Sequence, residues 1–221
     1  MIDRRKFVRA LALALTGLIS SGTKTERAKK PTMQRPKTVA GIALIDSKMA
    51  RLATELVRDT SPEYLFNHAA RTFLFGALIG NANNFKFDFE LLYLACILHD
   101  LGLTKRFAGA LPFEIQGAQA ARAFLTDNGL PSDQATMVWD GIAMHPFAIA
   151  SFKQPEIALV AAGAGADVVG SDLEKIPESA KAAVVNAFPR LDFKHAFCEN
   201  LRRSRAAVSP RRVAQLHARY R

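Results

Sequence analysis

The chain has 221 residues, 49% hydrophobic and 23% charged, a composition typical of one globular domain and too apolar for a disordered chain. Its net charge of +10 lies at the ends: residues 1–40 carry ten Lys or Arg against two acids, residues 201–221 carry seven Arg and no acid, and residues 41–200 carry 13 basic against 18 acidic residues. A mildly acidic body does not favour a groove that follows a phosphate backbone, so nucleic acid is not expected as a partner. Two cysteines form neither a disulfide framework nor a CxxC metal motif.

The N-terminus has the pattern of a targeting segment. Residues 1–22 resemble a twin-arginine export signal, because the Arg4-Arg5-Lys6-Phe7 sequence precedes a short apolar run at 10–19. That run is too short to span a bilayer as a mature helix. We therefore expect a periplasmic or exported protein that uses the export machinery; an uncleaved anchor or a misassigned start codon, with a cytoplasmic protein, is the alternative. Residues 23–40 are polar and contain prolines, which indicates a linker.

Apolar residues recur with the 3.6-residue period from Ala40 onward, which predicts an all-α body, a bundle of about seven helices over residues 41–200. Residues 201–221 are expected to form a basic C-terminal tail. The irregular stretch 103–112 is expected to form one wall of a pocket. Start and stop signals place the helices at 46–60, 61–81, 88–102, 113–128, 132–144 and 155–170, with two weaker ones at 177–187 and 193–207.

Two acidic residues stand where the core of this bundle is expected. The run 91–98 is apolar all round, which is typical of a central helix, and His99 and Asp100 follow it directly. Asp167 is the one polar side chain between residues 157 and 169. A buried carboxylate costs several kcal/mol unless a partner compensates its charge, and a bound cation is such a partner.

Two further features favour a shared site. Gly163 and Gly165 would let the helix around Asp167 approach a neighbour closely, and Gly102 is expected to cap the helix that ends after Asp100. His68 lies on a partly apolar helix face; taken alone it is more typical of a hydrogen-bonded core histidine than of a ligand. The whole set offers two imidazoles and two carboxylates, a ligand group suited to a divalent metal.

The order of His68, then His99-Asp100, then Asp167 resembles the HD superfamily of metal-dependent enzymes. Residues 65–71 and 93–104 are similar to its cyanamide hydratase branch. Further likeness lies in Phe113-Glu114 with Gly117-Ala118, in Val138-Trp139 before His145, and in residues 158–163 before Asp167. The likeness extends over roughly residues 40–195 and implies an HD-domain-like helical bundle around one metal site.

The resemblance implies that His68, His99, Asp100 and Asp167 bind one divalent metal, which is zinc in the hydratase; iron and manganese are alternatives. Members with two metals carry additional histidines between the doublet and the last Asp, where this chain offers His145 alone. Asp100 and His145 are the expected catalytic residues, with Asp100 also a proton carrier. The expected substrate-binding residues are Asn67, Thr104, Glu114 and His145, although Glu114 is also typical of a first-turn acid and His145 of a core histidine.

Three functions follow, all of them resting on the metal. The first is a hydratase or hydrolase that activates water to attack a small molecule, such as a nitrile. The second is a phosphohydrolase acting on nucleotides or phosphoesters; against it, Leu103 and Thr104 follow Gly102 where phosphohydrolases often carry a lysine, and the nearest cations are Lys105 and Arg106. The third is a catalytically inactive binding protein that the metal stabilises, since the Arg-rich C-terminus has no pattern of the hydratase branch.

Overall fold

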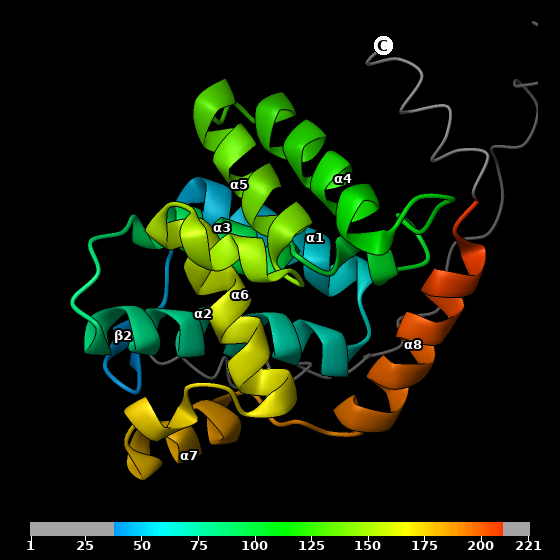
Figure 1. The fold of residues 1–221 in the computed structure, drawn as a ribbon. Coiled ribbons are helices and arrows are strands. Elements are labelled where there is room, and N and C mark those ends of the chain that lie inside the picture. The colour runs from blue at the N-terminus through cyan, green and yellow to red at the C-terminus, as the bar shows by residue number, and fades with distance from the viewer. Residues whose placement is uncertain (1–37, 210–221) are drawn as a thin grey trace, which may run out of the picture. The chain divides into compact units, whose positions relative to one another are not determined.

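Eight α-helices make up most of residues 38–209, the part of the chain that the computed structural model describes (Figure 1). The all-α bundle predicted from the sequence is confirmed, with a small hairpin and three short 3-10 helices in addition. The elements are, in chain order, β1 (Thr38–Val39), β2 (Ile42–Ala43), α1 (Lys48–Thr60), α2 (Glu63–Ala82), α3 (Phe89–Leu98), η1 (Leu101–Leu103), α4 (Phe113–Asp127), α5 (Ser132–Met144), η2 (Ala148–Phe152), α6 (Pro155–Val169), η3 (Leu173–Lys175), α7 (Glu178–Ala187) and α8 (Phe193–Ala207).

The boundaries of the described domain differ from the predicted ones at both ends. The antiparallel hairpin of β1 and β2 includes residues assigned to the linker, and Val39 and Ile42 are buried in the core. Two-residue strands are too short for an alternating pattern to show. At the other end, α8 has the bounds predicted for the last helix, 193–207, so the first residues assigned to the basic tail belong to that helix. The export signal and the remaining linker and tail predictions fall on residues 1–37 and 210–221, outside the described residues.

The end of α3 differs from its prediction in a way that affects the site. The helix stops at Leu98, His99 is its C-cap in the right-handed region, and η1 follows. Gly102 is therefore not the helix cap that the sequence indicated. It lies instead against α4, where a Cβ atom would come within 2.0 Å of the Phe113 carbonyl oxygen. The glycine is needed for this close approach of η1 to α4.

Helices α2 and α6 cross in close contact near the middle of the domain (Figure 1). A Cβ atom at Gly163 would lie 2.1 Å from the Thr72 carbonyl oxygen, and one at Gly76 would lie 2.7 Å from that of Leu159. The close approach predicted for Gly163 is thus confirmed. At Gly165 the nearest atom, from Ser171, is 3.5 Å away, so that glycine does not serve the contact. The contact brings the side chains of α2 and α6 together beside the end of α3.

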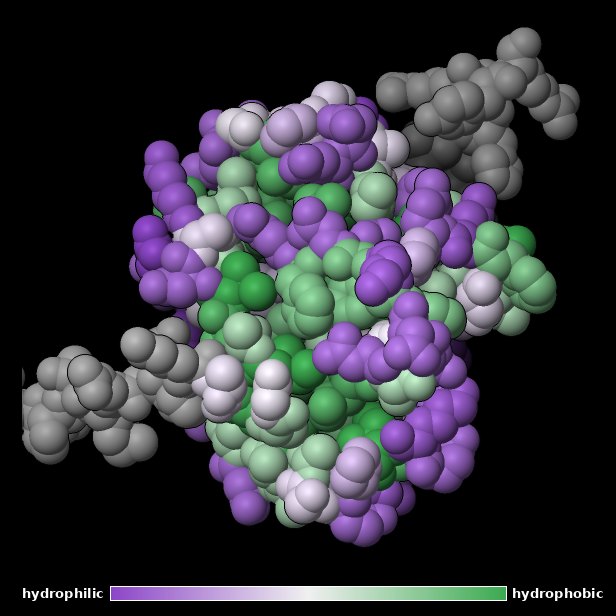
Figure 2. Space-filling view, turned by 90° about the vertical axis from the view of Figure 1, so that its left-hand side faces the viewer, coloured by the Kyte–Doolittle hydropathy of each residue, from purple (hydrophilic) through white to green (hydrophobic). Residues whose placement is uncertain are grey.

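The core is built around α3, whose residues Leu91–Leu98 are all buried. Every face of this helix is covered by other elements, so the residues that follow its C-terminal end also lie in the interior of the bundle. On the face shown in Figure 2, hydrophobic residues gather in the middle and hydrophilic ones border them. None of the helices between residues 38 and 209 has the length and apolar character needed to cross a membrane.

Candidate metal centre

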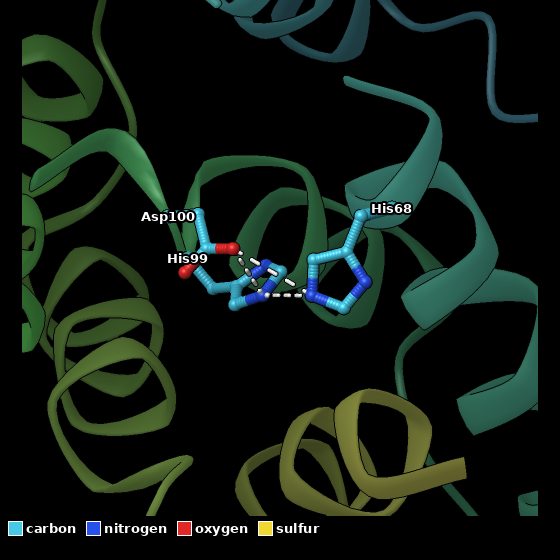
Figure 3. A group of neighbouring side chains, drawn as sticks. All are labelled: His68, His99 and Asp100. Carbon is cyan, nitrogen blue, oxygen red and sulfur yellow. Dashed lines mark hydrogen bonds and ion pairs between the residues drawn. The ribbon is translucent and has the colours of Figure 1, made fainter. Parts of the chain in front are cut away.

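Three side chains meet at the end of α3 and point toward one another (Figure 3). His68 comes from α2, and His99 and Asp100 follow the last residue of α3. The Nε2 atoms of the two histidines are 3.2 Å apart, and the Asp100 Oδ2 atom lies 3.3 Å from His99 Nε2 and 3.6 Å from His68 Nε2. All three residues are at most 3% exposed.

The outer nitrogens of both imidazoles have hydrogen-bond acceptors. His99 Nδ1 lies 2.7 Å from the Cys96 carbonyl oxygen, and His68 Nδ1 lies 2.7 Å from Asp167 Oδ2. Both Nδ1 atoms therefore donate, which leaves a lone pair on each Nε2 atom. Two lone pairs that face each other across 3.2 Å repel unless a positive charge lies between them.

The carboxylate of Asp100 has no hydrogen-bond partner for either of its oxygens among the described residues. Burial raises its pKa, but the nearby His99 and His68 outweigh burial and hold the pKa at about 2, so the group is charged at neutral pH. A buried charge without a hydrogen bond is rare in folded proteins, because its desolvation is not compensated. A cation at this position would compensate the charge.

The three atoms fit a divalent metal. Bonds of about 2.0–2.1 Å to a tetrahedral zinc ion place two ligand atoms about 3.3 Å apart. The observed separations of 3.2, 3.3 and 3.6 Å match one face of such a tetrahedron. His68, His99 and Asp100 are thus the residues that would hold the ion.

The electrostatics of the two histidines differ although both are buried. For His68, burial lowers the pKa and prevails over the Asp167 carboxylate, which acts in the opposite direction. For His99, burial also acts to lower the pKa, but the charge of Asp100 and the hydrogen bond to the Cys96 carbonyl oxygen outweigh it and raise the pKa. His68 is therefore the histidine that presents a neutral imidazole most readily.

Asp167, the fourth predicted ligand, lies on the opposite side of His68. The Arg71 Nε atom donates to its Oδ1 atom at 2.7 Å and Arg71 Nη2 to its Oδ2 atom at 2.8 Å, in addition to the bond from His68. Burial raises the pKa of Asp167, and the bonds from His68 and Arg71 outweigh it and lower the pKa to about 2. The structure brings together three of the four predicted ligands. Asp167 accepts a hydrogen bond from His68 Nδ1 and so orients this imidazole, and its role as a fourth ligand stays a prediction.

His145, predicted to be catalytic, lies at the edge of the cluster at the C-terminal end of α5. Its ring stands edge-on to that of His99, with 4.8 Å between the centroids. Its Nδ1 atom donates to the Ile142 carbonyl oxygen at 2.7 Å, which leaves Nε2 as an acceptor. Burial and the neighbouring His99 lower its pKa to about 3, so His145 is neutral at physiological pH.

The other predicted substrate-binding residues have contacts outside the cluster. The Asn67 Nδ2 atom donates to the Pro189 carbonyl oxygen at 3.0 Å. The Thr104 hydroxyl donates to the Leu101 carbonyl oxygen at 2.7 Å and closes η1. Glu114 is half-buried in the first turn of α4. Their role toward a substrate stays a prediction.

Three residues at the site did not emerge as functional from the sequence. Arg71 is fully buried and pairs with Asp167, and an arginine within an apolar helix was the signal for it. Phe193 and Phe197 of α8 cover the His68 ring, with centroid distances of 4.6 and 5.3 Å. Their spacing of four residues marks one face of that helix.

Comparison with known proteins agrees with the geometry of the site. Residues 65–183 match the model of the HD domain family, a range that contains all three clustered residues as well as Asp167 and His145. The chain is 27% identical over 173 residues to the cyanamide hydratases DDI2 and DDI3 of Saccharomyces cerevisiae, covering 76% of this chain and 77% of each relative. A buried His-His-Asp cluster inside a matching helical domain leads to one conclusion: the chain belongs to the HD domain family.

Proposed function

We propose that the protein is a metal-dependent enzyme that activates water for the hydration or hydrolysis of a small neutral molecule, in the manner of a cyanamide hydratase. The observation that carries this proposal is the charged Asp100 carboxylate, which has no hydrogen-bond partner among the described residues and faces two Nε2 lone pairs. A divalent metal held there, which we propose to be zinc with iron or manganese as alternatives, would lower the pKa of a bound water. The relation to DDI2 and DDI3 supports a hydratase reaction.

Two side chains of the cluster suit the proton movement that such a reaction needs. Hydration of a nitrile to an amide joins the oxygen of water to carbon and moves both protons of that water, one after the other, to nitrogen. Asp100 has two oxygens without hydrogen-bond donors from the described protein, so one of them can accept a proton while the other stays a ligand. His145, neutral and with a free Nε2 lone pair beside His99, is placed to accept a hydrogen bond from water or substrate.

The charges around the cluster favour a neutral substrate over a phosphoester. The two arginines that the structure places beside the cluster, Arg71 and Arg190, both pair with Asp167. Lys105 and Arg106, the cations that follow the His-Asp doublet, have exposed side chains. A phosphate group would need a cation free to receive it.

The test is metal content together with turnover of two substrate panels. We expect about one metal per chain in the purified protein, and hydration of small nitriles without release of phosphate from nucleotides. Asp100→Ala should lose both the metal and the activity, whereas His195→Ala, which removes a histidine that is 73% exposed on α8, should keep both. Phosphate release would favour a phosphohydrolase, and a bound metal without turnover in either panel would favour a binding protein.

A further inference from the structure

The three residues of the metal cluster are buried, and aromatic rings of α8 lie over His68. His68 and His99 are each 1% exposed and Asp100 is 3% exposed. The Phe193 ring stacks on His68 with an interplanar angle of 27°, and Phe197 stacks on Phe193 with 4.8 Å between the centroids. The α8 side of the cluster is thus closed by two stacked aromatic rings.

The apolar contacts of α8 with the rest of the described chain are separate from the main core. Phe193 and Phe197 form a small apolar cluster with Leu65 and Leu103, separate from the main core that joins α1 to α7. Helix α8 lies along the edge of the domain (Figure 1), and most of its side chains are exposed or half-buried. Elements with few buried apolar contacts open at a lower free energy than the core does.

The polar contacts of α8 with the rest of the described chain are also few. The Asn200 Nδ2 atom donates to the Tyr64 hydroxyl at 3.4 Å, which is long for a hydrogen bond. Beyond the helix, the Ser209 amide donates to the Ala110 carbonyl oxygen at 2.9 Å. The ion pairs of Glu199 join it to His195 and Arg203, within α8 itself.

The segment just before α8 is, in contrast, held firmly. Arg71 Nη1 donates to the carbonyl oxygens of Phe188 and Pro189 at 2.9 and 3.1 Å, and Asn67 donates to that of Pro189. Arg190 Nη1 donates to the Asp167 carbonyl oxygen at 2.8 Å. The chain is therefore anchored up to residue 190.

A strained residue follows directly after this anchor. Leu191 has a φ of 51°, in the left-handed region that a β-carbon disfavours, and its side chain is 57% exposed. A strained residue between a fixed segment and a loosely attached helix is a place where the backbone can change conformation at low cost. Relaxing Leu191 would lift the start of α8 while residues 188–190 stay in place.

We propose that α8 is a hinged cover of the metal centre and that Phe193 and Phe197 determine which substrates enter it. The cover swings at Leu191 and presents two apolar rings to the entering molecule, which selects small neutral substrates. The selectivity part rests on the proposed function, whereas the movement of α8 does not.

The movement can be tested on the full-length protein by amide hydrogen exchange with mass spectrometry. Amides of residues 193–207 should exchange at least about a hundredfold faster than those of residues 89–98, through a local opening that low concentrations of urea do not accelerate. Exchange of both segments in one common, urea-dependent step would overturn the hinged cover, whether or not the protein is an enzyme.

The role of the rings is tested by metal release to a chelator. Phe193→Ala and Phe197→Ala should each accelerate release at least about tenfold, because a large aromatic contact with the cover is lost. Phe152→Ala, which removes a phenylalanine that is 83% exposed on η2, is the matched control and should leave the rate unchanged. Equal release from all four proteins would overturn the role of the rings.

A third measurement addresses selectivity. Phe197→Ala should raise the turnover of bulkier nitriles relative to the smallest one, and an unchanged ratio would overturn the proposed selection by size. Absence of metal from the wild-type protein would instead count against the proposed function, while the exchange experiment would still decide the movement of α8.

Discussion

Two buried carboxylates, Asp100 after α3 and Asp167 in α6, face opposite nitrogens of His68 and differ in how their charges are compensated. Asp167 accepts hydrogen bonds from His68 and Arg71 and pairs with Arg190, so the protein itself neutralises it. Asp100 accepts no hydrogen bond from the described residues and has two histidines near it. Both are at most 3% exposed.

The difference separates a structural carboxylate from one that is kept for a ligand. The charge of a protein-paired carboxylate is compensated by its partners, whereas a carboxylate without hydrogen bonds can take a cation from outside as its partner. Burial alone does not distinguish the two, and substitutions at the two positions should therefore have different consequences.

The largest expected effect is on folding, from Asp167→Ala. The change leaves the Arg71 guanidinium buried without its carboxylate, and should lower the free energy of unfolding by about 3–5 kcal/mol. Urea unfolding in the presence of a chelator measures it without a contribution from metal. Asp127→Ala, at an exposed position in α4, should stay within about 0.5 kcal/mol of wild type. If Asp167→Ala lowered the free energy of unfolding as little as Asp127→Ala does, the ion pair between Arg71 and Asp167 would contribute little to stability.

Metal affinity, in contrast, should decrease more after a change at Asp100 than after one at Asp167. Asp100→Ala removes a ligand and should weaken metal binding by more than about a hundredfold, beyond the 10–100-fold typical of a residue that only orients a ligand. Asp167→Asn, which retains a hydrogen-bond acceptor for His68, should fall within that smaller range. Binding titrations with zinc measure both. An equal loss in the two variants would make Asp167 a direct ligand, as the sequence predicted.

The pH dependence of stability should reveal the contribution of Asp167. The folded-state pKa of Asp167, about 2, lies below its ordinary value of 3.8, so its contribution is present above pH 3.8 and is lost as the pH falls toward 2. This shift corresponds to about 2.4 kcal/mol. The stability difference between wild type and Asp167→Asn should therefore shrink between pH 5 and pH 3 in urea titrations. A difference that stays constant over this range would contradict the assignment.

The smallest effect is expected from Arg190→Ala. The side chain of Arg190 is 41% exposed, and Arg71 still holds both oxygens of Asp167 in its absence. Half-exposed ion pairs contribute about 1 kcal/mol or less, so the urea midpoint should move only slightly. A loss as large as that of Asp167→Ala would show that Arg190, rather than Arg71, compensates the carboxylate.

Much of the fold follows from helical periodicity and capping signals. The predicted helix at 132–144 has the observed bounds of α5, and those at 113–128 and 155–170 end one residue past α4 and α6. The hairpin at residues 38–43 was missed because strands of two residues have no period. The cap expected at Gly102 was wrong because a glycine can also serve close packing, and composition does not distinguish the two uses.

The sequence predicted the members of the site better than their arrangement. His68, His99 and Asp100 were identifiable as polar residues in apolar surroundings, and the structure brings them together. The position of Asp167 relative to His68 was not predictable, because it depends on Arg71, one turn after His68 on the same helix, competing for the same carboxylate. The contact of the Phe193 and Phe197 rings with His68 was not predictable, because it depends on how α8 packs against α2. No local sequence pattern specifies that packing.

The backbone contact of Gly163 with Thr72 bears on how the chain can change its length over evolution. Since α2 and α6 are held in register where their backbones touch, residues inserted between α4 and α5 would extend the surface without displacing His68 from Asp167. The number of residues between His68 and Asp167 in the sequence can therefore differ among relatives. A side chain at position 163 would act as a wedge between the two helices and separate His68 from Asp167, although it touches neither.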